Sequence, residues 1–272
     1  MKLLKYFVVG FLISVVGFGC SHRTHVPVEL EPMVEAQTPN FKIPVGERMK
    51  FSIRWLGLEV GTAIVEVKDI VQLNGRDAYH VFVLVRSNKI IDMIYPVKDE
   101  HHSYIDVEHL HSVRYEKNVR EGAYRAHEMM LYDQINHKAR YESLKNGSVK
   151  EMLIPKDVQD QLSCTYWFRI QPMKPGDRIH IPVNVDEKNW KLEVEVQAIE
   201  ELEIEGFGKI QAIRAEPFAK FSGLFVRKGR AWGWMSADER RIPLLMKTKI
   251  PVLGTISMVI VEYELGDFHV KT

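Results

Sequence analysis

The feature that most constrains the fold is a regular alternation of apolar and polar side chains, which begins near Arg48 and continues through most of the remaining chain. In the stretch RMKFSIRW, for example, the apolar residues Phe51 and Ile53 stand two positions apart, with the polar Ser52 between them. Successive side chains of a β-strand point to opposite faces, so this pattern is typical of half-buried strands. Turn signals such as the pair Asn74 and Gly75 divide the pattern every ten to twelve residues or so, which is typical of an antiparallel meander. The sequence therefore predicts an all-β, mainly antiparallel fold, either one large curved sheet or a half-open β-barrel.

One segment, residues 155–172 (PKDVQDQLSCTYWFRIQP), interrupts the alternation. Leu162 and Tyr166 stand at helical spacing, Asp157 is a suitable N-cap, and Pro172 ends the pattern. A single amphipathic helix between two groups of strands commonly plugs one end of a curved sheet or covers its concave face. We therefore expect one short helix packed against the sheet. The stretch SNKIIDMIYPV has the character of a second short helical turn.

The N-terminus has the pattern of a secretory leader, with two lysines ahead of an apolar run. The run is shorter than the roughly 20 residues that cross a bilayer, which favours a cleaved signal peptide over an anchor. Cys20 follows Gly19, and a cysteine directly after a small residue resembles the bacterial lipobox, although Gly17 stands where that motif usually has leucine. We expect residues 1–19 to be a signal peptide and Cys20 to be the acylated first residue of the mature protein. An ordinary signal peptide cut near Cys20 is the alternative.

Residues 20–45 contain four prolines and show no periodicity, so we expect a lipidated N-terminus followed by a flexible tether. Ser21 lacks the aspartate that typically keeps bacterial lipoproteins in the inner membrane. By this resemblance the protein belongs to the cell envelope, anchored through its lipid on the periplasmic face of the outer membrane. We expect residues 46–268 to form a single β-rich domain.

Charge and cysteine content narrow the choice of partners. The chain has 37 Lys and Arg residues against 36 Asp and Glu residues, so no net field favours nucleic acid. With Cys20 acylated, Cys164 has no partner for an internal disulfide and is more typical of a small core residue than of a nucleophile. No motif indicates a cofactor.

Four stretches together resemble a bacterial family of unknown function, DUF3108: GERMKFSIRWLGLEVGTAIVEV, PVKDEHHSYIDVEHLHSVRYEK, DQLSCTYWFRIQPMKPGD and GRAWGWMSADERRIP. The similarity extends over about residues 45–266. The residues that carry it are Asp99, Ser103, Asp106, Asp160, Leu162, Ser163, Tyr166, Arg169, Trp234, Ser236, Asp238, Arg241 and Pro243. The resemblance implies an exported, mostly β domain, often on a lipoprotein. It brings no catalytic residues with it.

The densest polar cluster, DEHHSYIDVEHLH, contains weak candidates for metal ligands in His101, His109 and His111. Two imidazoles and a carboxylate that meet across a hairpin are able to hold zinc. The chain lacks HExxH or a comparable motif of fixed spacing, and strand histidines commonly line a wet face. Asp160 and Ser163 lack the GxSxG elbow of a hydrolase, so a role at the start of the helix is favoured for them.

A curved antiparallel sheet with an incompletely filled interior is a common carrier of acyl chains, and this analogy rests on the fold alone. We expect a non-enzymatic protein that binds an acyl-chain ligand or an envelope protein partner. Residues that would line such a site are Trp55, Phe168, Trp232 and Trp234. The alternatives are a metal-dependent hydrolase that uses the His101–His111 cluster and a purely structural scaffold.

Overall fold

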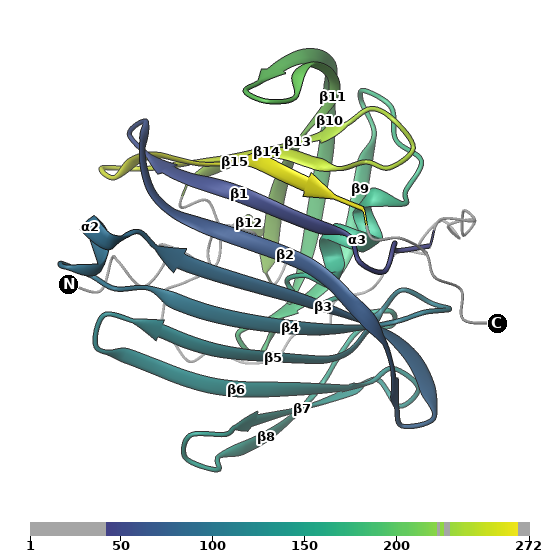
Figure 1. Ribbon diagram of the computed structural model, residues 1–272. Coiled ribbons are helices and arrows are strands. Elements are labelled where there is room, and N and C mark those ends of the chain that lie inside the picture. Colours follow the sequence, from purple (N-terminus) through teal and green to yellow (C-terminus); the bar gives the residue numbers. More distant parts are fainter. Residues whose placement is uncertain (1–41, 222–223, 226–228, 266–272) are drawn as a thin grey trace.

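The computed structural model describes residues 42–221, 224–225 and 229–265. Its strands form one antiparallel sheet in the order β8-β7-β6-β5-β4-β3-β2-β1-β15-β14-β13-β11-β10-β9, with β12 paired to β11 beside this path (Figure 1). The prediction of a mainly antiparallel β fold is confirmed. The predicted signal peptide, Cys20 and residues 21–41 of the predicted tether lie outside the described residues.

In the first half of the described chain the strands are β1 (Arg48–Trp55), β2 (Leu58–Leu73), β3 (Arg76–Ser87), β4 (Lys98–Asp106), β5 (Ser112–Glu121), β6 (Tyr124–Asp133), β7 (Lys138–Ser143) and β8 (Val149–Leu153). The second half contains β9 (Arg178–Val185), β10 (Lys188–Ile204), β11 (Gly208–Phe221), β12 (Leu224–Phe225), β13 (Arg230–Ser236), β14 (Pro243–Ile250) and β15 (Gly254–Glu264). Helix α2 (Lys89–Asp92) follows β3, and helix α3 (Ser163–Arg169) separates the two groups of strands. Among the described residues no helix is long and apolar enough to span a membrane.

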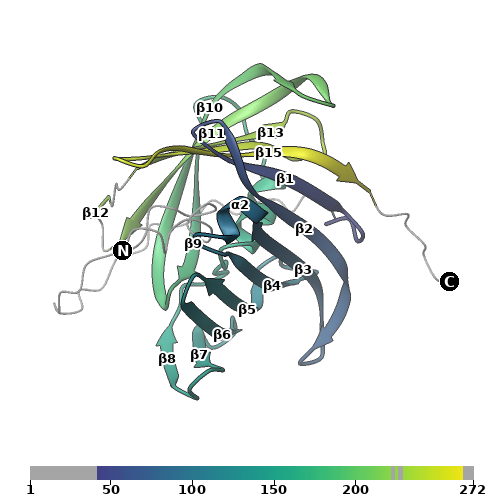
Figure 2. The same cartoon turned by 60° about the vertical axis from the view of Figure 1, so that its left-hand side comes forward.

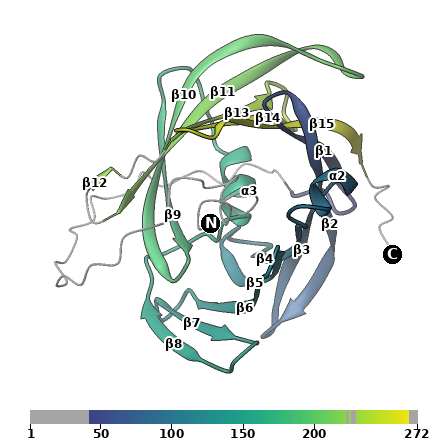
Figure 3. The same ribbon diagram turned by 90° about the vertical axis from the view of Figure 1, so that its left-hand side faces the viewer.

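Irregular register explains why the sheet curls. β1 carries one shift between Lys50 and Phe51 against β15 and another between Ile53 and Arg54 against β2. Further shifts interrupt β4, β10 and β13. A bulge bends its strand and increases the local twist. The result is the half-open barrel of Figure 3, in which the sheet wraps around α3.

The segment 154–162, called the strap here, links edge strand β9 to the start of β5. The Gln159 N–H donates to the Pro182 carbonyl at 2.8 Å, and the Asn184 N–H donates to the Gln159 carbonyl at 2.8 Å, so the strap pairs in parallel with edge strand β9. On its other side the strap accepts a hydrogen bond of 3.2 Å from the N–H of Ser112, at the start of β5. The strap therefore ties one edge of the sheet to an interior strand and leads directly into α3.

Helix α3 begins at Ser163, well after Asp157, which we predicted as its N-cap. That prediction was wrong, because the strap pairs with β9 before the helix starts. Asp157 has a left-handed backbone with φ of +53° and lies within the strap. Asp160 Oδ1 instead accepts the N–H groups of Leu162 at 2.7 Å and of Ser163 at 2.9 Å. A carboxylate here satisfies N–H groups that a helix start leaves without intrahelical partners.

Helix α3 is held between two walls of the barrel. Cys164 and Phe168 pack into a core formed with β9, β10 and β11. Tyr166 and Ile170 face the opposite wall, in a core formed with β2, β3 and β4. Ile43 is buried in this second core, so the packed part of the chain already includes residue 43. The helix thus divides the interior, and the space beside it forms the candidate site.

Candidate ligand site

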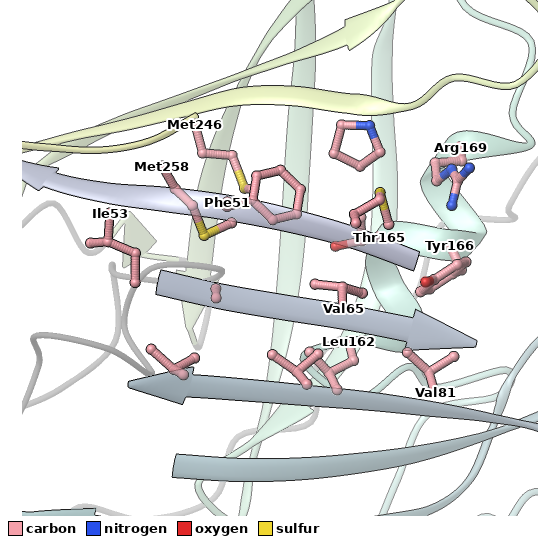
Figure 4. Close-up of a pocket in the computed structure, with 15 residues that line it drawn as sticks. Phe51, Ile53, Val65, Val81, Leu162, Thr165, Tyr166, Arg169, Met246 and Met258 are labelled. Carbon is pink, nitrogen blue, oxygen red and sulfur yellow. The ribbon is translucent and has the colours of Figure 1, made fainter. Parts of the chain in front are cut away.

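The inner faces of β1, β2, β3 and β15 present apolar side chains towards α3, and packing between them is incomplete. A cavity of about 60 Å³, called the inner cavity, lies between Phe51 and Ile53 of β1, Met258 of β15, and Leu162 and Thr165 beside or on α3. Figure 4 shows these side chains pointing into one space from the strands and from the helix. The hollow is almost wholly apolar because alternation places only the apolar face of each strand inside.

A second, larger cavity of about 240 Å³, called the end cavity, lies between β1, β2, β3 and α2. Ile53 and Val85 line both cavities, so the two hollows share a wall of side chains. Trp55 lines the end cavity, and its indole N–H donates to the Leu253 carbonyl at 2.7 Å, which fixes the ring. Ile91 from α2 lines the same cavity. Figure 2 shows α2 at this end of the barrel, beside the start of β2.

Exposed apolar residues surround this end of the barrel. The Leu56 N–H donates to the Thr255 carbonyl at 3.3 Å, which joins the β1–β2 turn to the β14–β15 turn. The Asn88 side chain donates to the Glu59 carbonyl at 2.6 Å, which joins α2 to the start of β2. Ile94 is 83% exposed and still lines the end cavity. The exposed residues, called the apolar rim, are Leu56, Leu58, Ile90, Met93, Ile94 and Val252.

The other end of the inner cavity is polar, and the positive charge of Arg169 there is balanced by the carboxylate of Glu47. Arg169 lines the cavity, and its guanidinium forms two hydrogen bonds of 2.7 Å with the carboxylate of Glu47. Burial raises the pKa of Tyr166, so this residue stays a neutral phenol. Its hydroxyl has no hydrogen-bond partner among the described residues, although it is buried and belongs to the cavity lining. A buried hydroxyl without a partner is free to bond a polar atom of a ligand or a water molecule.

The polar side of the interior, formed by β4 and β5, contains His101. Its Nδ1 lies 2.6 Å from the Tyr115 hydroxyl and 3.3 Å from the Gln161 amide nitrogen. Burial, aided by the charge of Lys117, lowers the pKa of His101 to about 3. His101 is therefore a neutral, hydrogen-bonded interior residue. The structure does not bring it together with His109 and His111, which stack on each other in the loop after β4.

The candidate nucleophiles hold structural positions. The Ser163 hydroxyl accepts the Asp160 N–H at 2.8 Å, and Asp160 Oδ2 accepts the Ser103 hydroxyl at 2.6 Å. Burial raises the pKa of Asp160, although its hydrogen bonds oppose that shift. Cys164 is buried, and burial raises the pKa of its thiol to about 12, which leaves no thiolate for attack at neutral pH.

The aromatic residues expected to line a ligand site occupy three different places. Trp55 lines the end cavity. Phe168 packs in the core between α3 and β9–β11. Trp232 and Trp234 line a separate, open and largely polar cleft of about 620 Å³ with Arg214 and Arg230.

The short helical turn predicted in SNKIIDMIYPV is confirmed as α2, but the apolar rim was missed at the sequence level. The signal was present in SNKIIDMIYPV, because Ile90, Met93 and Ile94 exceed what a single short turn is able to bury. The unpaired hydroxyl of Tyr166 has no sequence signal, since a helical tyrosine at an apolar position indicates only a core residue.

Fold and site together define a half-open antiparallel β-barrel with an apolar hollow beside an internal helix. The chain matches the model of a family described as a protein of unknown function (DUF3108) over residues 50–261, and it belongs to that family. The sequence resemblance is thereby confirmed. No curated protein matches the chain.

Solved structures that match the chain also come from proteins without an assigned role. A β-barrel-like protein of the family DUF1849 from Brucella abortus is 10% identical, with a TM-score of 0.56 over 82% of this chain and 98% of that one. A candidate lipoprotein from Parabacteroides distasonis is 7% identical, with a TM-score of 0.37 over 82% and 97% of the two chains. An exported protein with a YmcC-like fold from Bacteroides fragilis is 10% identical, with a TM-score of 0.31 over 82% and 99%. The first of these supports the β-barrel-like fold, and at such identities nothing beyond the fold is carried over.

Proposed function

We propose that this protein is a non-enzymatic binding protein of the cell envelope, whose inner and end cavities receive an acyl chain. The observation that carries the proposal is the end cavity, an apolar hollow of about 240 Å³ that shares a wall with the inner cavity. Together with the inner cavity it approaches the lower limit of small-molecule sites, roughly 300 Å³. Protein interiors are normally close-packed, so a hollow of this size is unusual in a scaffold alone.

The lining favours a hydrocarbon over a polar ligand. Apolar cavities of roughly 150 Å³ stay dry and bind apolar molecules, because water finds no partners inside them. Each methylene moved from water into such a space contributes about 0.8 kcal/mol. The hydroxyl of Tyr166 is the partner available for a polar atom at the inner end. A single chain with few polar atoms fits this lining better than a sugar or a nucleotide.

The apolar rim supports entry from the α2 end. Ile94 belongs both to the wall of the end cavity and to the exposed surface. A ligand that passes Ile94 therefore moves directly from solvent into the end cavity. Exposed apolar groups at a cavity mouth are common where a ligand leaves a membrane or a carrier protein. A lipid on Cys20 and the tether that precedes Ile43 would keep the domain near the periplasmic face of the outer membrane. An envelope protein that docks on the rim is the second candidate, favoured by the same exposed residues.

The test is native mass spectrometry of the protein from residue 21 onwards, followed by organic extraction of what it carries. We expect a bound lipid or fatty acid in the purified protein and saturable uptake of a fluorescent fatty acid. Val85→Phe narrows both cavities and should weaken that uptake at least tenfold, whereas the same substitution at exposed Val149 on β8 should not change it. A protein that is empty and takes up no fatty acid would refute acyl-chain binding and favour the docking of a protein partner.

A further inference from the structure

The loop between β4 and β5 gathers ligand atoms of a kind and spacing that metal ions bind. Asp106, His109 and His111 each offer one such atom, and these atoms all lie within 4.8 Å of one another. His111 Nδ1 also lies 3.3 Å from Oδ1 of Asp157, which belongs to the strap. We propose that these four residues form a site for a divalent transition metal, with zinc as the ion that two imidazoles and two carboxylates suit best.

Two of the distances in this group are close to those between neighbouring ligands of a tetrahedral centre. Zinc holds nitrogen and oxygen ligands at about 2.1 Å, which places neighbouring ligand atoms about 3.4 Å apart. His109 Nδ1 lies 3.1 Å from Asp106 Oδ1, and His111 Nδ1 lies 3.3 Å from Asp157 Oδ1. The two rings stack with centroids 5.3 Å apart and planes 9° apart. The two rings therefore stand side by side, each with a carboxylate oxygen within hydrogen-bond distance of its Nδ1.

The carboxylate of Asp106 is already oriented for this role. It is buried, and its Oδ1 accepts the N–H groups of Glu108 at 2.9 Å and of His109 at 2.7 Å. In metal sites, a carboxylate that binds the ion is usually itself held in place by hydrogen bonds from neighbouring groups. The Arg76 guanidinium lies 3.7 Å from Oδ2 of Asp106 and competes with a cation there. The Arg76 side chain is 42% exposed, so it has room to withdraw into solvent.

The ligand set indicates a structural centre. Four protein ligands leave no open position for water or substrate, and closed sites of this kind stabilise folds. None of the four residues lines the inner or the end cavity. Asp157 comes from the strap, whereas the other three come from the β4–β5 region, so one ion would fasten the strap to the barrel wall. That link would fix the segment that joins β9 to β5.

The experiment is a titration of the chelator-treated protein, from residue 21 onwards, with Zn²⁺ in a calorimeter and with Co²⁺ in a spectrophotometer. We expect one ion per chain, the strong visible absorption of tetrahedral cobalt, and a higher melting temperature with zinc. His109→Gln is the main variant, because His109 is exposed and its replacement should not unfold the protein. It should lower zinc affinity at least tenfold, and Asp157→Asn should do the same.

His180→Gln is the matched control. His180 Nε2 also lies 3.1 Å from a carboxylate oxygen, that of Glu193, yet among the described residues it belongs to no group of three possible metal ligands. We expect this variant to bind zinc as the parent does. The absence of saturable binding at one ion per chain, or equal loss in His109→Gln and His180→Gln, would overturn the proposal. Neither result bears on acyl-chain uptake, which is measured separately.

Discussion

Glu47 and Arg169 form a bidentate ion pair in the interior, with both hydrogen bonds at 2.7 Å and both side chains almost inaccessible to solvent. The pair joins the residue before β1 to the last residue of α3. Arg169 also donates to the Arg240 carbonyl at 3.0 Å, and its guanidinium lies 5.1 Å from the centre of the Tyr166 ring. One side chain therefore fixes the helix relative to β1 and the β13–β14 loop, and it sets the polar end of the inner cavity.

Removal of one partner of this pair should be strongly destabilising. In Arg169→Met the carboxylate of Glu47 stays buried without its counter-charge, which typically costs about 3–5 kcal/mol. The double variant Glu47→Leu with Arg169→Met should be less destabilised than the sum of the two single variants, because no charge remains buried. Urea denaturation of the four proteins measures this difference. Additive losses would show that the two side chains act independently.

Asp160 should tolerate asparagine but not alanine. Its two oxygens accept the hydroxyls of Ser103 and Ser112 and the first N–H groups of α3. In Asp160→Asn the amide oxygen remains as an acceptor for the N–H groups, and the amide nitrogen is able to donate to the hydroxyls. Asp160→Ala leaves these buried groups without partners, at about 1–3 kcal/mol for each unsatisfied group. We expect Asp160→Asn to stay within about 1 kcal/mol of the parent and Asp160→Ala to lose at least about 3 kcal/mol in chemical denaturation. Similar losses in both variants would contradict this account.

The stretches that carry the family resemblance explain the fold rather than a reaction. Ser103 and Asp160 bond to each other, Arg169 pairs with Glu47, and the Ser236 hydroxyl accepts the Ile242 N–H at 2.8 Å. All three are buried contacts; the first two join distant segments, whereas the third closes the loop between β13 and β14. Their order along the chain was visible in the sequence, but their partners were not, since Glu47 and Arg169 are 122 residues apart.

Strand positions and turn chemistry were predictable because they depend on local residues. Asn74 and Gly75 have φ of +51° and +79°, the positive values that the predicted tight hairpin turn requires. Which face of a strand lies on the concave side of the sheet depends on how the whole sheet curls, and not on local residues. Trp55 and Trp234 have equally apolar surroundings in the sequence, yet one lines the end cavity and the other a separate cleft. The start of α3 was mispredicted for the same reason, since pairing of the strap with β9 decides it.

His101 should make stability depend on pH. Its pKa is lowered to about 3 by burial, whereas a histidine in the unfolded chain titrates near 6.5. Between about pH 6.5 and pH 3 the unfolded chain therefore binds a proton that the folded protein does not. The free energy of unfolding should fall as pH decreases through this window, by up to about 1.4 kcal/mol per pH unit from this residue. His101→Gln should reduce the slope of the unfolding free energy against pH in this window by the contribution of one bound proton. An NMR titration in which the His101 ring protonates near pH 6.5 in the folded protein would refute this prediction.

The Cys164 thiol should be unreactive until the protein unfolds. Burial raises its pKa to about 12, and its sulfur donates to the Gln161 carbonyl at 3.4 Å. We expect an aromatic disulfide reagent to label Cys164 within seconds in denaturant and negligibly in the folded protein at pH 8. The protein from residue 21 onwards is suitable, because it contains no other cysteine. Rapid labelling of the folded protein would show that α3 leaves its position easily.

The apolar rim should control ligand exchange without contributing to stability. Met93 and Ile94 are 79% and 83% exposed, so Met93→Ser with Ile94→Ser removes little buried surface and should change the free energy of unfolding by less than about 1 kcal/mol. If the rim is the entrance to the end cavity, the same variant should slow transfer of a fluorescent fatty acid from lipid vesicles several-fold. Ile135→Ser is the control, because Ile135 is 71% exposed in the β6–β7 turn, away from both cavities. Stopped-flow fluorescence measures the transfer rate. Equal rates in the parent, the rim variant and the control would exclude the α2 end as the entrance, even if the cavities bind the chain.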